Sequence, residues 1–278
     1  MDPIRIGVVS RSFPALTHAE IARTLEAAGA ASTELCLLSA DTAYWVYNGR
    51  SDLATLTDAK FAAIVDTYRS RGIGIPALGV FTNLIDPDED ERQKNLDYYE
   101  RHMALANRQG IPFVSTECGF TPHHRGVNAD RYEEDFGRLS RSLADLCQRA
   151  AYHNVCIALE TCVIDIVPSA KRARDLIRQV GSDRLRILLD PANLIANASE
   201  RDMFAYLAPY VAYFHGKDRK VNDAYGRAVG DGDIDWPLFL SLYHEHCEGK
   251  PFILEYVGPD NFREVMARVR AYDAQARA

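Results

Sequence analysis

The sequence predicts an α/β fold, a single closed (β/α)8 barrel that takes up residues 1–278 as one domain. Eight short apolar runs alternate with segments of helical pattern, an order typical of parallel strands joined by helices. None of the runs requires an antiparallel hairpin turn, and no linker or change in composition divides the chain. Barrels of this class commonly use about 250 residues for one domain. Length and alternation together favour the barrel.

An open, doubly wound parallel sheet is the structural alternative. Such a sheet normally carries a glycine-rich phosphate-binding loop after its first strand. The corresponding segment here, VVSRSFP at residues 8–14, contains no glycine. The closed barrel therefore remains the preferred interpretation.

The strands are expected where short apolar runs end in polar or turn-forming residues. They cover residues 4–10, 33–39, 75–83, 111–119, 155–161, 185–193, 211–218 and 251–258. Because side chains alternate along a strand, residues two positions apart point to the same side. If the polar residue at a strand end points inward, the residue two positions before it should also point inward. Ala158, Tyr213 and Ile253 should point inward, and Ile157 and Leu159 should pack outward against helices.

Helices are expected where capping residues open, and glycines close, a helical pattern. Thr17 and Glu20 form a capping box for the first helix, which should end near Gly29. Asp130 and Glu133 form a similar D-x-x-E pattern for a helix that ends at about residue 152. The remaining helices are expected over residues 57–71, from 86–91 to 108, over 168–180, 201–209 and 236–247, and from 261 onward.

The composition excludes several classes of protein. The net charge is −7 and no basic block is present, which disfavours a nucleic-acid partner. No run of 18 apolar residues and no basic-then-apolar start is present, so membrane insertion and export are not expected. The six cysteines form no CxxC pair and read as free thiols in a reducing compartment. We expect a cytoplasmic homo-oligomer, a dimer or a tetramer.

Four adjacent strands end in residues that bind metals. Glu160, Asp190, His215 and Glu255 follow strands five to eight, at the carboxyl-terminal face where barrel active sites lie. Three carboxylates in a small volume would repel one another, and a divalent cation removes that repulsion. The ligand types suit Mn²⁺, which we expect, or Mg²⁺, Co²⁺ or Zn²⁺. The absence of cysteine ligands argues against a closed structural zinc site.

Further strand-end residues are candidates for binding a substrate. Glu117 and Asn83 also end strands and, if they point inward, would reach substrate hydroxyl groups; the alternative is that they cap the following loops. The aromatic residues Tyr44, Trp45 and Tyr47 could form a lid over a ligand or simply cover the rim of the barrel.

The segments ALET, LLDPAN, FHGKD, GDGDIDW and ILEY resemble the xylose-isomerase-like TIM barrels, the superfamily of sugar phosphate isomerases and epimerases. The resemblance covers most of the chain. It implies that Glu160, Asp190, His215 and Glu255 bind one metal ion and that Glu160 and Glu255 are also the catalytic acid/base pair. It further implies a small keto-sugar or hydroxy-keto acid as substrate, isomerised or epimerised through an enediolate.

Two positions depart from the ketose 3-epimerases of that superfamily. Those enzymes hold the substrate with a histidine three residues after the metal-binding aspartate, where this chain has Asn193. After His215 the chain continues with Lys217 and Asp218, as in related isomerases and dehydratases. Asn193, Lys217 and Asp218 are therefore candidate substrate-binding residues. Lys217 could bind a carboxylate or phosphate, help a hydroxyl group leave, or form only an ion pair.

The same site is compatible with other activities. A lyase would abstract the same proton and then expel a β-hydroxyl group from a keto-polyol or a dehydroshikimate-like acid. A DNA-repair endonuclease of this fold would need three metals and more histidines than these strand ends offer. A sugar-binding protein without catalysis would leave the pair of glutamates unexplained.

Overall fold

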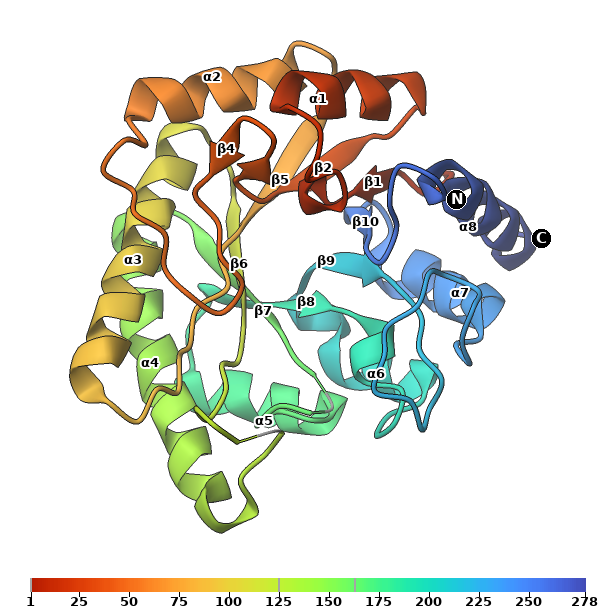
Figure 1. Cartoon of the computed structure of the whole chain (residues 1–278). Helices are drawn as coiled ribbons and strands as arrows, with labels where there is room; N and C mark the ends of the chain where they lie inside the picture. Colours follow the sequence, from red (N-terminus) through yellow and green to blue (C-terminus); the bar gives the residue numbers. More distant parts are fainter. Residues whose placement is uncertain (1, 125, 163) are drawn as a thin grey trace.

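The computed structural model describes residues 2–124, 126–162 and 164–278, and it contains the predicted barrel. Eight parallel strands lie in the order β1-β10-β9-β8-β7-β6-β5-β2, with the helices around them (Figure 1). The strands are β1 Ile6–Val8, β2 Ser32–Leu35, β5 Gly74–Gly79, β6 Phe113–Glu117, β7 Cys156–Glu160, β8 Leu185–Leu189, β9 Val211–Gly216 and β10 Phe252–Leu254. The fold class predicted from the sequence is confirmed.

The first and last strands of this order meet and nearly close the barrel. The amide of Ala31 donates a hydrogen bond to the carbonyl of Ile6 at 2.8 Å. The hydroxyl of Thr33 donates to the carbonyl of Val8 at 2.7 Å. Gly7 permits this approach, because a Cβ atom there would lie 2.5 Å from the carbonyl oxygen of Ser32.

The helices agree with the predicted pattern in most places. They are α1 His18–Ala27, α2 Asp58–Arg69, α3 Glu89–Arg108, α4 Tyr132–Tyr152, α5 Ala170–Val180, α6 Glu200–Leu207, α7 Trp236–Cys247 and α8 Phe262–Ala276. The capping box of Thr17 and Glu20 is present. Asp130 is not the cap of α4, because residues 129–131 form a 3-10 turn and the helix begins after Arg131, whose side chain makes no capping bond.

All eight predicted strand ranges run past the end of the observed strands, and in two of them the structure shows what ends the strand. The run 33–39 stops being a parallel strand at Leu35, and β3 (Leu38–Ser39) then pairs antiparallel with β4 (Thr42–Ala43). The expectation that no antiparallel hairpin occurs was therefore wrong. The run 185–193 leaves the sheet after Leu189, because the side chain of Asp190 accepts a hydrogen bond from the amide of Ala192 at 2.9 Å and starts a 3-10 turn.

The predicted inward and outward residues are confirmed. Ala158, Tyr213 and Ile253 belong to a small apolar cluster inside the barrel. Ile157 and Leu159 belong to the large cluster that includes the surrounding helices. The strand ends carry the polar side chains that follow these inward residues, so the alternation positions them over the barrel mouth.

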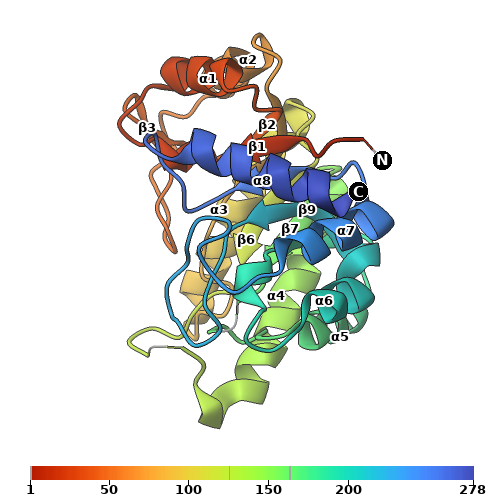
Figure 2. The same cartoon turned by 90° about the vertical axis from the view of Figure 1, so that its right-hand side faces the viewer.

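One end of the barrel carries the longest loops. Figure 2 shows β3 and the loop 219–235 at the same end of the molecule.

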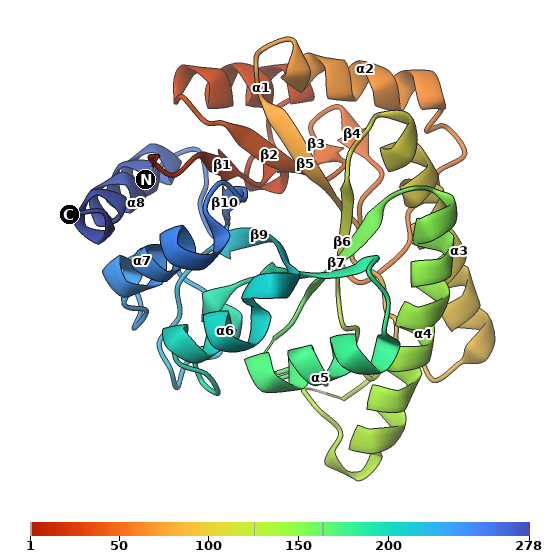
Figure 3. The same ribbon diagram turned by 180° about the vertical axis from the view of Figure 1, so that it is seen from behind.

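Figure 3 shows the amino terminus beside the carboxy-terminal helix α8, where the amide of Ile4 donates to Asp273 at 3.3 Å. Within the described ranges, no helix combines the length and the apolar character that crossing a membrane would need.

Candidate active site

The four strand-end residues predicted as metal ligands lie together at the barrel mouth. Glu160 ends β7, Asp190 follows β8, His215 lies in β9 and Glu255 follows β10. All four are buried, and one possible ligand atom from each lies within 4.8 Å of the others. Nδ1 of His215 is buried and has no hydrogen-bond partner among the described residues. Because buried polar atoms are normally satisfied, this nitrogen fits a site that could hold a cation.

A fifth buried residue, Glu34, orients the histidine. Oε2 of Glu34 lies 2.5 Å from Nε2 of His215, and its Oε1 accepts a hydrogen bond from the hydroxyl of Ser115 at 2.7 Å. This contact places the proton on Nε2 and directs Nδ1 toward Glu160 and Glu255, which lie 3.6 and 3.7 Å away. Burial alone would lower the pKa of His215, but Glu34 and Glu160 raise it well above its ordinary value.

The amine of Lys217 lies among the three carboxylates. Nζ is 2.7 Å from Asp190, 2.9 Å from Glu255 and 3.4 Å from Glu160. Burial would lower the pKa of Lys217, but the carboxylates, Asp190 foremost, raise it well above its usual value. Its positive charge therefore compensates the acidic cluster, and the structure realises the ion-pair alternative for this residue.

Removal of this ammonium group should change how the site binds cations. In Lys217→Met the three carboxylates lose the one counterion that contacts all of them, so we expect Mn²⁺ to bind about tenfold more tightly, the scale of one charge-assisted contact. The melting temperature without Mn²⁺ should fall for the same reason. Calorimetric titration and thermal unfolding measure the two effects. Unchanged Mn²⁺ affinity would show that Lys217 and the cation do not compete.

Burial and charge give the carboxylates different proton affinities. Burial raises the pKa of Glu160, but Lys217 and His215 outweigh it and bring the value to about 2. The pKa of Glu255 is lowered as well, because Lys217 and Arg11 outweigh the effect of burial. For Asp190, burial dominates and raises the pKa to about 7. The two glutamates are therefore the charged members of the cluster near neutral pH.

Asn193 holds Glu160 in place. Its Nδ2 donates to Oε1 of Glu160 at 2.7 Å, and its Oδ1 accepts from Nη2 of Arg219 at 3.1 Å. Asn193 and Arg219 are both buried. The amide is therefore oriented from both sides, and Arg219, which the sequence did not single out, connects the loop 219–235 to the site.

Asp218 organises that loop. Its carboxylate is fully buried and accepts hydrogen bonds from the indole of Trp236 and from three backbone amides, those of Arg219, Gly230 and Ile234. Gly232 is required nearby, because a Cβ atom there would lie 2.1 Å from Oδ1 of Asp218. With these donors the structure offers Asp218 no free acceptor for a substrate, and we assign the residue to the framework of the loop.

Arg11 is another functional candidate that the sequence did not reveal, besides Glu34 and Arg219. It follows β1 and forms an ion pair with Glu255. Its guanidinium carbon lies 5.6 Å from the ring centre of Trp45 and 5.7 Å from that of Phe81. The pair fixes Glu255 from the end of the neighbouring strand β1, and the aromatic rings restrict the guanidinium group.

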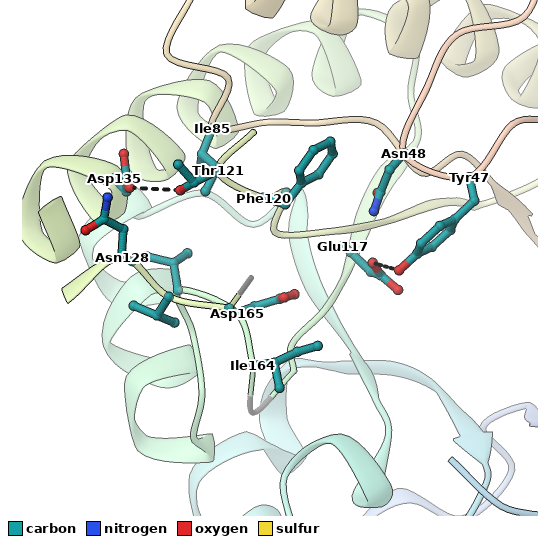
Figure 4. Close-up of a pocket in the computed structure, with 14 residues that line it drawn as sticks. Tyr47, Asn48, Ile85, Glu117, Phe120, Thr121, Asn128, Asp135, Ile164 and Asp165 are labelled. Atoms are coloured by element: carbon teal, nitrogen blue, oxygen red, sulfur yellow. Dashed lines mark hydrogen bonds between the residues drawn. The ribbon is translucent and has the colours of Figure 1, made fainter. Parts of the chain in front are cut away.

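Glu117 and Asn83, two further residues predicted to bind substrate, have different surroundings in the structure. Oε2 of Glu117 accepts a hydrogen bond from the hydroxyl of Tyr47 at 2.7 Å, and burial together with Glu160 raises its pKa to about 7. Asn83 is buried, and its Oδ1 accepts from the amides of Ile85 and Phe120. Asn83 therefore ties two loops together, whereas Glu117 lies in the wall of a cavity (Figure 4).

The sequence matches the family described as "Xylose isomerase-like TIM barrel" over residues 22–272. No curated protein sequence matches the chain.

Three solved structures illustrate which proteins share this fold. D-psicose 3-epimerase from Clostridium cellulolyticum H10 is 14% identical, with a TM-score of 0.73 over 99% of this chain and 98% of that one. A 3-keto-D-glucoside 4-epimerase from E. coli is 15% identical, with a TM-score of 0.77 over 96% and 99%. The IOLI protein with a binding zinc atom is 15% identical, with a TM-score of 0.73 over 99% and 96%. At these identities the likeness establishes the fold.

Proposed function

Because the chain belongs to the xylose isomerase-like TIM barrel family, we propose that it is a divalent-metal-dependent isomerase or epimerase of a small keto-sugar or hydroxy-keto acid. The observation that carries the proposal is the buried cluster of Glu160, Asp190, His215 and Glu255 at the barrel mouth. Solved structures of the same fold include two sugar epimerases and a protein with zinc, which supports this class of activity and a metal.

The four clustered residues would hold the cation, and the donor set of three carboxylates and one imidazole suits Mn²⁺ best. When bound, the ion would stabilise negative charge that develops on the substrate oxygens. Glu34 would keep Nδ1 of His215 directed at the cation, and Lys217 would give up its place among the carboxylates. The site therefore combines a fixed ligand set with a counterion that can move.

Glu160 and Glu255 would transfer the proton. Both carboxylates are charged near neutral pH, so each can act as a base. One removes a proton from the carbon beside the substrate carbonyl, which gives an enediolate. The other must take up a proton before it can return one, and for Glu255 the ammonium group of Lys217, 2.9 Å away, would supply it. The first glutamate then releases its proton to solvent, from which Lys217 regains one. Return to the opposite face of the same carbon is epimerisation, and return to the neighbouring carbon is isomerisation. Asn193 and Arg11 hold the two glutamates in position for these steps.

A dehydratase is the second candidate, and the position of Lys217 favours considering it. The ammonium group lies 2.9 Å from Glu255, so a proton donor for a leaving β-hydroxyl group would stand beside one of the proposed bases. Such an enzyme would act on a keto-polyol or a dehydroshikimate-like acid. The proton abstraction is the same in both reactions, and only the second step differs.

Deuterium exchange tests the proposed function. The purified protein is incubated with Mn²⁺ and a panel of ketoses and hydroxy-keto acids in D₂O, and the products are analysed by NMR and mass spectrometry. We expect deuterium at the carbon beside the carbonyl of at least one compound, without loss of water. Loss of water and a new enone absorbance would support the dehydratase instead. Absence of both reactions would contradict the proposal.

A further inference from the structure

A cavity opens beside the proposed metal site. Its walls come from the segment after β4 with Tyr47, the end of β6 with Glu117, the following Phe120, and the segment after β7 with Asp165. Glu117 is the sheet partner of Glu160, so one wall of the cavity is continuous with the metal cluster. A molecule that reached the cluster from this side would extend into the cavity.

The cavity offers hydrogen-bond acceptors. Asp165 projects into it between the pair Tyr47–Glu117 and the pair Thr121–Asp135 (Figure 4). Oδ2 of Asp165 is buried and has no hydrogen-bond partner in the described part of the chain. Burial and the neighbouring Glu117 raise the pKa of Asp165 well above its ordinary value. A buried carboxyl oxygen without a partner is unfavourable in either protonation state, and a ligand hydroxyl group, which can donate or accept, would satisfy it.

The charge of the walls selects among ligands. Glu117, Asp135 and Asp165 contribute carboxyl groups, and none of the described lining residues is Lys, Arg or His. A phosphate or carboxylate group would be placed among carboxyl groups, without a cationic partner among the described lining residues. Hydroxyl groups bring donors and acceptors and no charge. The described walls are therefore complementary to hydroxyl groups and lack the cation that an anionic group would need.

The rim of the cavity is apolar. Tyr47, Phe120 and Ile164 are among the exposed large hydrophobic side chains of the protein, and all three line this cavity. Pockets for small molecules typically combine such surfaces with a few placed polar groups. Carbon-bound hydrogens of a sugar could lie on the rim while its hydroxyl groups reach the carboxylates.

We propose that this cavity binds the end of the substrate distant from the metal site, and that this end is an uncharged chain of hydroxyl groups, not a phosphate or carboxylate. The inference rests on the proposed function and narrows its substrate class to unphosphorylated ketoses. Asp165 accepts a hydrogen bond from a substrate hydroxyl, and Glu117, held by Tyr47, accepts another.

Equilibrium binding tests the inference without requiring turnover. The Mn²⁺-loaded protein is titrated with six-carbon ketoses and with their 6-phosphates, by calorimetry and thermal shift. We expect at least one free ketose to bind, and its 6-phosphate to bind at least about tenfold more weakly. Equal or tighter binding of the phosphates, or no binding of any free ketose, would overturn the inference.

Two variants test the named residues. Asp165→Asn and Glu117→Gln should each weaken the binding of the free ketose by about tenfold. They should also reduce the difference in affinity between the free ketose and its 6-phosphate. The control Asp90→Asn alters an exposed carboxylate on α3 and should bind like the unmodified protein. Wild-type ketose affinity in both cavity variants would refute the assignment. Ketose binding without deuterium exchange would refute the proposed function but not the cavity.

Discussion

The variant Glu255→Gln is expected to lose turnover by at least about a hundredfold, the usual contribution of a positioned acid or base. The amide cannot accept the substrate proton, and it removes one negative charge from the four clustered residues. Its partners Arg11 and Lys217 would also lose their ion pairs. Mn²⁺-dependent deuterium exchange measures the rate, and calorimetry measures the accompanying loss of Mn²⁺ affinity.

The matched control is Glu264→Gln, which changes an exposed glutamate on α8 whose partner is Arg268. It should exchange deuterium at the rate of the unmodified protein. Normal exchange in Glu255→Gln would contradict the proposed acid/base role. A variant that loses Mn²⁺ binding but regains exchange at saturating Mn²⁺ would make Glu255 a ligand only.

The second large effect is expected for Glu34→Gln, although Glu34 does not face the cation. The neutral amide no longer favours the proton on Nε2 of His215, so the imidazole is held less firmly in the orientation that exposes Nδ1. Loss of such an outer partner typically lowers metal affinity by about 10- to 100-fold. We expect weaker Mn²⁺ binding of that size by calorimetry.

A surface variant of the same chemistry, Glu26→Gln on α1, should leave Mn²⁺ affinity unchanged because its partner is the exposed Arg71. If Glu34→Gln bound Mn²⁺ as tightly as the unmodified chain, His215 would not depend on Glu34 for its orientation. Excess Mn²⁺ should restore exchange in Glu34→Gln, since both glutamates that we propose as acid and base remain.

The sequence was sufficient to predict the barrel and the position of the cluster. The alternation of apolar runs and helices leaves few alternatives to a parallel sheet, and parallel strands carry their terminal side chains to one end. Glu160, Asp190, His215 and Glu255 stand at the ends of neighbouring runs, so their proximity could be inferred. Their role as ligands remains a proposal.

The partners of the cluster could not be predicted in the same way. Glu34 lies inside an apolar run, and its contact with His215 joins residues 181 positions apart. Arg11 and Glu255 follow the neighbouring strands β1 and β10, but they lie 244 positions apart in the sequence, so no local pattern encodes their contact. A buried charge in the second strand was the available signal for Glu34, because such a charge needs a partner.

Loop contacts limited the prediction of substrate residues. Asp218 lies three residues after His215, which suggested a substrate contact. Three of its four donors come from residues 230–236, which fold back over it. The hairpin of β3 and β4 was missed for a related reason, since strands of two residues give no periodic signal.

Titration of the unmodified protein with Mn²⁺ tests the central claim, that these four side chains bind a catalytic divalent cation. The account predicts one ion bound per chain, released protons as His215 gives up its proton to bind the ion, and strongly weakened binding in Asp190→Asn. Absence of binding by Mn²⁺, Mg²⁺, Co²⁺ and Zn²⁺, or unchanged binding in Asp190→Asn, would contradict it.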